Sequence, residues 1–283
     1  WAAIANCQVT GIGLPHWRGA ITLSDGVELE SSINQLTPEQ LTQLPINKVL
    51  RDKRNRLWSV DDPNGAPGEQ LAVKLNRARG IKRFTYRFTE SKAKRHWDNA
   101  SYMLRCAVNT PEPVAYFERH QNSGIENSYY LCRYLDDAFS ARDIFTAFKS
   151  GQQQYRGFSK DQLLDEIGAF IYWMHDQRVI HRDLSSGNLM MTATPTEGLK
   201  LYVIDIGRAS LHLKKRLSSR QVFLDLSRIC YKLDWTDRAT LIAHYNRHSL
   251  KRSKRELPSW WRIPVYLYQQ KQVWKKRIKG AFR

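Results

Sequence analysis

The chain has 283 residues and carries 45 Lys and Arg against 27 Asp and Glu, which gives a formal net charge of +18. Hydrophobic residues make up 42% and aromatic residues 11% of the chain, enough for a sizeable core, so composition excludes a wholly disordered protein. The positive excess predicts an anionic partner, and nucleic acid, an acidic lipid surface and a phosphorylated or carboxylated substrate all fit it.

The cysteines and the early sequence indicate the compartment. The four cysteines are scattered, without a CxxC pair or zinc-ligand spacing, which favours a reducing environment. The uncharged stretch 1–17 is too short and too polar to span a bilayer, and it lacks the charged start of a signal peptide. We therefore expect a cytoplasmic protein, with peripheral contact at a membrane surface as a further option.

Residues 1–44 are expected to form an N-terminal extension. Within them, Thr37-Pro38-Glu39-Gln40 is a helix start, with Thr37 as the N-cap and Pro38 at the first helical position. A short helix over 38–44 should follow.

Residues 45–135 are predicted to form a small, mostly antiparallel sheet that carries one helix and serves as the N-lobe. The helix is expected over 91–104, where Ala93, Trp97 and Ala100 share one face. Strands are expected at 48–50, 57–60, 71–75, 114–118 and 129–135.

Residues 136–283 are predicted to form a mainly helical C-lobe. The strongest amphipathic pattern lies at 159–177, with Ser159 as its N-cap. Further helices are expected over 219–233 and 237–248. The fold class is therefore α+β, with a small antiparallel β N-lobe and a mainly helical C-lobe.

Two short sequences carry the chemistry. His181 to Asn188 reads H-R-D-L-S-S-G-N and matches the kinase catalytic-loop pattern H-R-D-L-x-x-x-N at full spacing, and Asp205-Ile206-Gly207 stands where D-F-G would be. A β run of V-K type ending in Lys74 lies upstream. Three such elements in this order predict a bilobal protein-kinase-like phosphotransferase.

The predicted roles follow from phosphoryl transfer, which needs positioning and charge neutralisation more than covalent help. Asp183 is expected to orient the acceptor hydroxyl and accept its proton. Lys74 is expected to hold the α- and β-phosphates of ATP. Asn188 and Asp205 offer oxygen ligands of the kind that Mg²⁺ prefers.

A narrower likeness lies between the predicted lysine strand and the hinge. The run Ser91 to Ala100 (S-K-A-K-R-H-W-D-N-A) and the run Asn109 to Ala115 (N-T-P-E-P-V-A) resemble the S-x-A-x-x-x-W-x-N-A and T-P-x-P-x-A patterns of the lipopolysaccharide kinase (Kdo/WaaP) family of Gram-negative bacteria. This resemblance implies ATP and Mg²⁺ as cofactors and a sugar hydroxyl of the lipopolysaccharide inner core, on heptose or Kdo, as the acceptor. It also implies a hinge in which main-chain groups near Arg133 and Leu135 meet adenine.

The chain departs from the kinase pattern in three places. No glycine-rich loop joins the first two predicted strands. The helix glutamate that would pair with Lys74 is not obvious, and Glu90 is the expected partner because its side chain has the reach. Only 17 residues separate Gly207 from Asp225, which resembles the buried aspartate that braces a kinase catalytic loop. So short a segment disfavours a peptide substrate.

The basic residues cluster in two stretches, at 74–95 and in the aromatic tail at 259–283. They fit either a solvated cationic face or docking on an anionic glycolipid or on the inner-membrane surface. Nucleic acid is not expected, because no RNP, KH or helix-turn-helix signature is present. The alternatives to a lipopolysaccharide kinase are a protein or antibiotic kinase and a non-catalytic basic binding module of the same fold.

Overall fold

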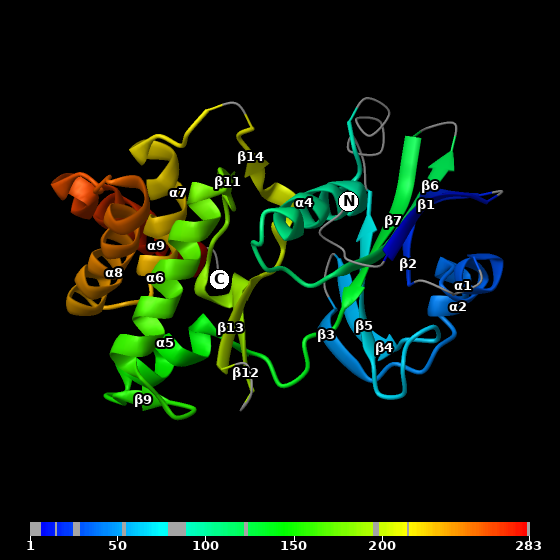
Figure 1. Ribbon diagram of the computed structural model, residues 1–283, viewed down its shortest axis with the longest axis horizontal. Coiled ribbons are helices and arrows are strands. Elements are labelled where there is room, and N and C mark those ends of the chain that lie inside the picture. The colour runs from blue at the N-terminus through cyan, green and yellow to red at the C-terminus, as the bar shows by residue number, and fades with distance from the viewer. Residues whose placement is uncertain are drawn as a thin grey trace. The chain divides into compact units, whose positions relative to one another are not determined.

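The computed structural model describes residues 7–14, 16–24, 29–52, 55–78, 89–121, 124–194, 198–213 and 215–281. The chain forms two compact units, labelled by element in Figure 1. The first comprises Trp1–Asp136 together with Asp205–Gly207, and the second comprises Asp137–Ile204 and Arg208–Arg283. The first unit thus ends one residue beyond the expected end of the N-lobe.

The first unit is built on a seven-stranded sheet in the order β1-β2-β6-β7-β5-β4-β3, in which every neighbouring pair is antiparallel. The prediction of an antiparallel sheet in this half of the chain is confirmed. The strands are β1 (Cys7–Gly13), β2 (Trp17–Ser24), β3 (Lys48–Asp52), β4 (Arg56–Asp61), β5 (Gln70–Arg77), β6 (Pro113–Gln121) and β7 (Gly124–Arg133).

The expected N-terminal extension is part of this sheet, so the boundary predicted at residue 44 is wrong. Strands β1 and β2 continue the sheet beyond β6, and the short helices α1 (Leu29–Gln35) and α2 (Pro38–Leu41) follow them. Thr37 caps α2 as predicted, and the indole of Trp17 donates a 2.8 Å hydrogen bond to Glu39. Apolar residues of this segment join the same core cluster as those of β4, β5 and β7: Ile12, Trp17, Ile21, Leu36 and Leu41. The boundary was misplaced because burial, which unites these residues with the sheet, is a tertiary property.

Helix α4 (Lys92–Arg105) packs on the sheet and carries the residues that matter most for the site. Ser91 is its N-cap and accepts a hydrogen bond from the main-chain N–H of Lys94, as expected for a serine at this position. Ala93 and Trp97 are buried against Tyr130 of β7. The predicted apolar face of this helix is therefore the face that meets the sheet.

The second unit is mainly helical, as predicted. Its long helices are α5 (Ala141–Lys149), α6 (Lys160–Asp176), α7 (Ser219–Cys230), α8 (Trp235–Ser253) and α9 (Arg262–Ala281), with the 3-10 turns η1 (Ser186–Asn188) and η3 (Ser259–Trp261). The turn η2 (Ile206–Arg208) begins in the first unit and ends in the second. The short strands are β8 (Phe139–Ser140), β9 (Gln154–Tyr155), β10 (Phe158–Ser159), β11 (Val179–Ile180), β12 (Leu189–Thr194), β13 (Gly198–Val203) and β14 (Ser210–Leu211).

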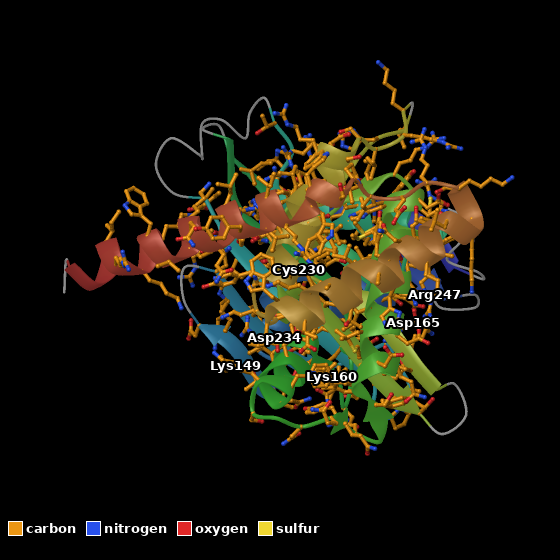
Figure 2. The ribbon with its side chains drawn as sticks, turned by 90° about the vertical axis from the view of Figure 1, so that its left-hand side faces the viewer. Lys149, Lys160, Asp165, Cys230, Asp234 and Arg247 are labelled. Atoms are coloured by element: carbon orange, nitrogen blue, oxygen red, sulfur yellow. The ribbon has the colours of Figure 1, made fainter. Side chains whose placement is uncertain are left out.

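Helices α6 and α8 form the centre of the second unit. Gly168 of α6 lets the two backbones approach closely, because a Cβ at this position would lie 3.0 Å from the main-chain nitrogen of Tyr245. Ion pairs join side chains of the two helices: Lys160 pairs with Asp237 at 2.8 Å. Asp165 pairs with Arg247 at 2.5 Å, and both of these residues are labelled in Figure 2. Within the described residues, no helix combines the length and the apolarity that crossing a bilayer requires.

Candidate active site

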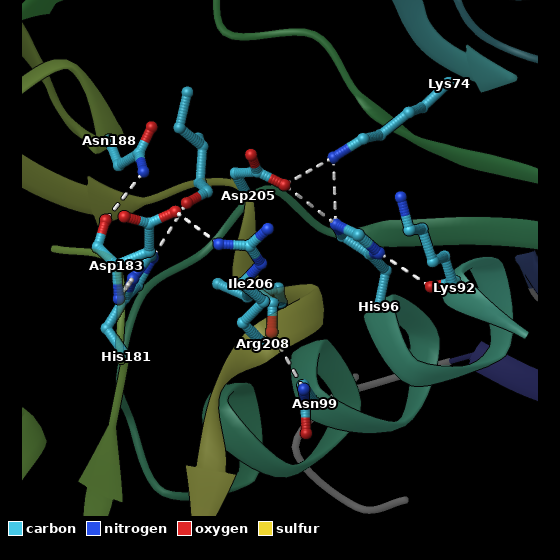
Figure 3. A network of polar contacts seen from close by, with 11 residues as sticks. Lys74, Lys92, His96, Asn99, His181, Asp183, Asn188, Asp205, Ile206 and Arg208 are labelled. Carbon is cyan, nitrogen blue, oxygen red and sulfur yellow. Dashed lines mark hydrogen bonds and ion pairs between the residues drawn. The ribbon is translucent and has the colours of Figure 1, made fainter. Parts of the chain in front are cut away.

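Lys74 of β5 is the centre of a polar cluster in the first unit. Its Nζ lies 2.6 Å from Oδ1 of Asp205 and 3.0 Å from Nε2 of His96 (Figure 3). The lysine side chain is 15% exposed and the Asp205 side chain 44%, so the ion pair is partly shielded from water at one end and open at the other. Two of the residues predicted from the sequence, Lys74 and Asp205, are thus brought together.

His96 of α4 holds Lys74 from the buried side. Its Nδ1 lies 2.7 Å from the main-chain oxygen of Lys92, and since a carbonyl oxygen only accepts, Nδ1 carries the ring proton. Burial, followed by the charge of Lys74, lowers the pKa of His96 below its ordinary value, so the ring is neutral near pH 7. The remaining nitrogen, Nε2, is then the acceptor for the ammonium group of Lys74.

The Asp205–Gly207 segment is fixed against α4 by two further contacts. The buried side-chain amide of Asn99 donates a 2.8 Å hydrogen bond to the main-chain oxygen of Ile206. Gly207 lies directly under the imidazole of His96, because a Cβ there would come 2.2 Å from Cε1 of the ring. A glycine at this third position is therefore required by the packing of His96.

Asp205 is held in its ionised form. The Lys74 ammonium beside it keeps the pKa of the Asp205 carboxyl well below its usual range. Its backbone has a positive φ of 58°, an uncommon conformation for a residue with a Cβ. Such a conformation indicates that the direction of this carboxylate is imposed by its surroundings.

The expectation that Glu90 pairs with Lys74 is wrong. Oε1 of Glu90 instead binds Nζ of Lys94 at 2.8 Å, and the same ammonium group binds Asp98 at 2.5 Å. Both pairs have the i, i+4 spacing that brings helix side chains together. Glu90 and Asp98 are therefore both bound to Lys94, although the reach of their side chains made them plausible partners of Lys74.

The predicted catalytic loop in the second unit is braced by Asp225 of α7, as expected from the sequence. The two oxygens of this fully buried carboxylate accept hydrogen bonds from the main-chain N–H groups of His181 at 2.6 Å and Arg182 at 2.8 Å. Nε2 of His181 lies 2.9 Å from the main-chain oxygen of Ile204, the residue before Asp205. Arg182 has a positive φ of 63°, so Asp225 stabilises a turn that is strained for a residue with a side chain.

Asp183 and Asn188 are brought together at the two ends of this loop. The side-chain amide of Asn188 donates a 2.8 Å hydrogen bond to the main-chain oxygen of Asp183 (Figure 3). The main-chain oxygen of Asn188 accepts a 2.9 Å hydrogen bond from the N–H of Ile204. The Asp183 carboxylate is 40% exposed and lies 3.4 Å from the guanidinium of Arg208. It is therefore open to a molecule that approaches from solvent.

The two predicted hinge residues differ in what they offer a nucleotide. The N–H of Arg133 donates to the main-chain oxygen of Glu112 at 2.9 Å, and its guanidinium pairs with Asp62 and Glu69. This N–H is thus already used within the fold. Within the described part of the chain, the main-chain N–H of Leu135 has no hydrogen-bond partner, so of the two it is the one with a free main-chain donor.

Oxygen atoms suited to a hard divalent cation are present on both predicted ligands. Oδ2 of the ionised Asp205 and the side-chain oxygen of Asn188 accept no hydrogen bond from any residue that the structure describes. A carboxylate and an amide oxygen are the kind of donor set through which Mg²⁺ binds while keeping several waters. The residues present therefore fit this ion.

Sequence reasoning missed the roles of His96, Asn99 and Arg208. A signal for the first two was available, because both lie on the buried face of α4 with Ala93, Trp97 and Ala100. Polar groups on such a face need hydrogen-bond partners. Arg208 directly follows the Asp205–Gly207 motif, but nothing in its spacing indicates that its side chain turns toward Asp183.

Comparisons with known proteins found a matching family and similar solved structures. The model of the lipopolysaccharide kinase (Kdo/WaaP) family matches residues 44–245. A solved structure of WaaP in complex with acyl carrier protein is similar, with a TM-score of 0.56 and 19% identity over 81% of this chain and 91% of that one. The Rio2 kinase of Chaetomium thermophilum, solved with ADP, Mg²⁺ and phosphoaspartate, gives a TM-score of 0.45 and 14% identity over 94% and 72% of the two chains. No curated protein matches the chain.

Proposed function

The chain belongs to the lipopolysaccharide kinase (Kdo/WaaP) family and has a protein-kinase-like fold, and from this premise we propose that it transfers the γ-phosphate of ATP to a sugar hydroxyl of the lipopolysaccharide inner core, on heptose or Kdo. The observation that carries the proposal is the 2.6 Å ion pair between Lys74 and the ionised Asp205. A cation for phosphate oxygens and an anion for a metal ion stand side by side there. This arrangement serves a nucleotide-binding enzyme better than a non-catalytic basic module.

Each residue has a definite task in this proposal. Lys74 binds the α- and β-phosphates, and His96 keeps its ammonium group in place without neutralising it. Asp183 orients the acceptor hydroxyl and takes its proton as the oxygen attacks the γ-phosphorus. Asn188 and Asp205 hold Mg²⁺ through their side-chain oxygens. When bound, Mg²⁺ neutralises the charge that develops on the phosphate oxygens.

A sugar acceptor is favoured over a peptide because so little chain follows the metal motif. Of the 17 residues between Gly207 and Asp225, those that the structure describes hold the last residue of η2, the two-residue strand β14 and the first half of α7. Protein kinases use a longer segment there to seat a peptide. The open carboxylate of Asp183, with Arg208 beside it, suits an acceptor that carries negative charge.

Helix α9 supports a second part of the proposal, contact with the inner-membrane surface from the cytoplasmic side. Ile263, Leu267 and Trp274 are 56%, 60% and 64% exposed, and their spacing of 4 and 7 residues places them on one helix face. Exposed basic residues flank this face, among them Lys271 and Arg277. An apolar stripe bordered by cations is the pattern of a helix that lies in the headgroup region of an anionic membrane.

The test is radiolabelled transfer from ATP to two acceptors, deacylated core oligosaccharide and a generic protein. We expect label in the oligosaccharide, lost in Asp205→Ala. Label that enters only the protein would support a protein kinase instead. ATP turnover that persists unchanged in Asp205→Ala would contradict the proposed mechanism.

A further inference from the structure

A cavity in the second unit lies among α6, α7 and α8 (labelled in Figure 1) and contains none of the residues assigned to catalysis. Its volume is about 290 Å³. A cavity of about 150 Å³ accommodates a benzene molecule, so this one has room for a phosphate group with a small sugar attached. Its lining is polar and cationic: Arg178, Arg216 and Arg255 contribute guanidinium groups, and Ser219, Ser249 and Ser253 contribute hydroxyls.

The arginines of this cavity lack acidic partners. Among the residues that the structure describes, none of Arg178, Arg216 and Arg255 forms an ion pair with a carboxylate. Arg178 is held in place by a 2.6 Å hydrogen bond from Nη1 to the main-chain oxygen of Leu213. Of the two acids in the lining, Asp176 is paired with Arg252, which leaves Glu256 as a single negative charge against three positive ones. Guanidinium groups left without carboxylates around a cavity are suited to an anionic ligand.

Two further groups point to a ligand with several acceptor oxygens. Ser219, at the start of the 12-residue helix α7, lies in the lining, so the positive end of the helix dipole is directed at the cavity. Tyr172 also lines the cavity and is only 6% exposed, so its hydroxyl faces the same enclosed space as the three arginines.

The same cavity borders the support of the catalytic loop. His175 lines it, and Nε2 of this ring lies 3.4 Å from Oδ2 of Asp225, the carboxylate that holds the main chain of His181 and Arg182. Nδ1 of His175 lies 3.2 Å from the hydroxyl of Tyr245, another lining residue. A ligand in the cavity would therefore restrict groups that contact Asp225.

We propose that this cavity is a binding site for a phosphomonoester, and that its occupancy stabilises the catalytic loop through His175 and Asp225. The three arginines bind the phosphate oxygens, with Ser219 as an additional donor. The ligand acts as an effector, because no lining residue is a donor or acceptor in phosphoryl transfer. The proposal of this binding site does not depend on whether the acceptor of the proposed reaction is a core sugar.

Binding is tested on the full chain by calorimetry with glucose 6-phosphate. We expect one site that survives Lys74→Ala and is lost in both Arg216→Glu and Arg255→Glu. Lys149→Glu is the matched control, since it makes the same charge change at an exposed position outside the cavity (Figure 2). Binding lost in Lys74→Ala but kept in Arg216→Glu would place the anion at the nucleotide site and overturn the proposal.

Two more measurements complete the test. Vesicles of phosphatidylcholine with and without phosphatidic acid distinguish a lipid phosphate from a soluble one. If the ligand is a lipid, Arg216→Glu should reduce binding to the vesicles that contain phosphatidic acid more than Lys149→Glu does. If the ligand is soluble, the two variants should bind these vesicles equally. Hydrogen exchange at the amides of His181 and Arg182 should slow when glucose 6-phosphate binds. Binding without slower exchange would refute the effector role, and no binding by either source would refute the site.

Discussion

Nε2 of His96 accepts a hydrogen bond from the ammonium group of Lys74 at 3.0 Å, and this bond replaces the lysine–carboxylate pair expected from helix α4. A neutral ring fixes the direction of the lysine but leaves its charge uncompensated on that side. Among the described residues, the one carboxylate that contacts Lys74 belongs to Asp205, which is also the predicted metal ligand. When Asp205 turns to a cation, the positive charge of Lys74 becomes available to phosphate.

Replacement of His96 should mainly weaken the binding of ATP. In His96→Ala the ammonium group loses a hydrogen bond of the charged type, worth about 1.5–3 kcal/mol, so the KM for ATP should rise by roughly one to two orders of magnitude. Steady-state kinetics with ATP as the varied substrate measure this. Asp98→Asn on the same helix is the control, with little expected change. Equal effects of the two variants would mean that His96 acts only as packing.

Acidification should destabilise the protein through His96 and then through Asp205. The pKa of His96 in the folded state lies below its ordinary 6.5, so below that pH the unfolded chain binds the extra proton more readily and the free energy of unfolding falls. The lowered pKa of Asp205 adds a second loss as the pH falls below its ordinary 3.8. Urea unfolding of wild type and His96→Gln between pH 7.5 and 5 tests the first effect. The variant, which lacks the proton site, should show the shallower pH dependence, and parallel curves would exclude the assignment.

Gly207→Ala should disturb His96 directly. The added Cβ would come 2.2 Å from the imidazole, and overpacking of this kind costs about 1–3 kcal/mol. Both the urea midpoint and the affinity for ATP should fall, because the ring that holds Lys74 must move. Gly11→Ala is a suitable control, as a Cβ at Gly11 meets nothing within 4 Å. Unchanged ATP affinity in Gly207→Ala would show that His96 can shift without releasing Lys74.

Asp225→Asn should weaken the hydrogen bonds that hold the predicted catalytic loop, while the volume of the side chain at position 225 stays almost the same. An amide side chain has one acceptor oxygen, and its NH₂ group would face one of the two main-chain N–H donors of His181 and Arg182. Loss of a buried, charge-assisted contact of this kind costs about 2–4 kcal/mol. We expect a lower unfolding midpoint, faster amide exchange at these two residues and a reduced kcat at saturating ATP. A stability loss with normal kcat would argue against a catalytic loop in this segment.

The exposed face of α9 should determine membrane binding. Replacement of Leu267 and Trp274 by Gln removes two large apolar side chains that are 60% and 64% exposed. Co-sedimentation with vesicles containing anionic lipid should fall several-fold, while phosphoryl transfer to a soluble acceptor stays normal. Leu213→Gln, at a similarly exposed leucine outside α9, is the control. If vesicle binding depends on salt concentration but is the same with and without Leu267 and Trp274, the proposed interfacial role of the helix is refuted.

The sequence was most informative where the chemistry demands fixed spacing. The motif from His181 to Asn188, the bracing Asp225, and Lys74 and Asp205 as site residues could all be predicted, because phosphoryl transfer requires these residue types in this order. Helix α4 followed from its N-cap and apolar periodicity. The partner of Lys74 could not be predicted, since Glu90, Asp98 and His96 all lie within reach and only burial distinguishes them. The role of strands β1 and β2 was missed for the same reason, as pairing with β6 joins residues about 100 positions apart.

Residues Asp205–Gly207 belong by their contacts to the first unit, although the chain on both sides belongs to the second. A fragment that ends at Asp136 would therefore leave Lys74 without its counter-ion, Asn99 without the carbonyl that satisfies its amide, and the His96 ring without the glycine against which it packs. The first unit is thus completed by three residues made about 70 positions later, and it can reach its final form only after the chain has been synthesised past Gly207.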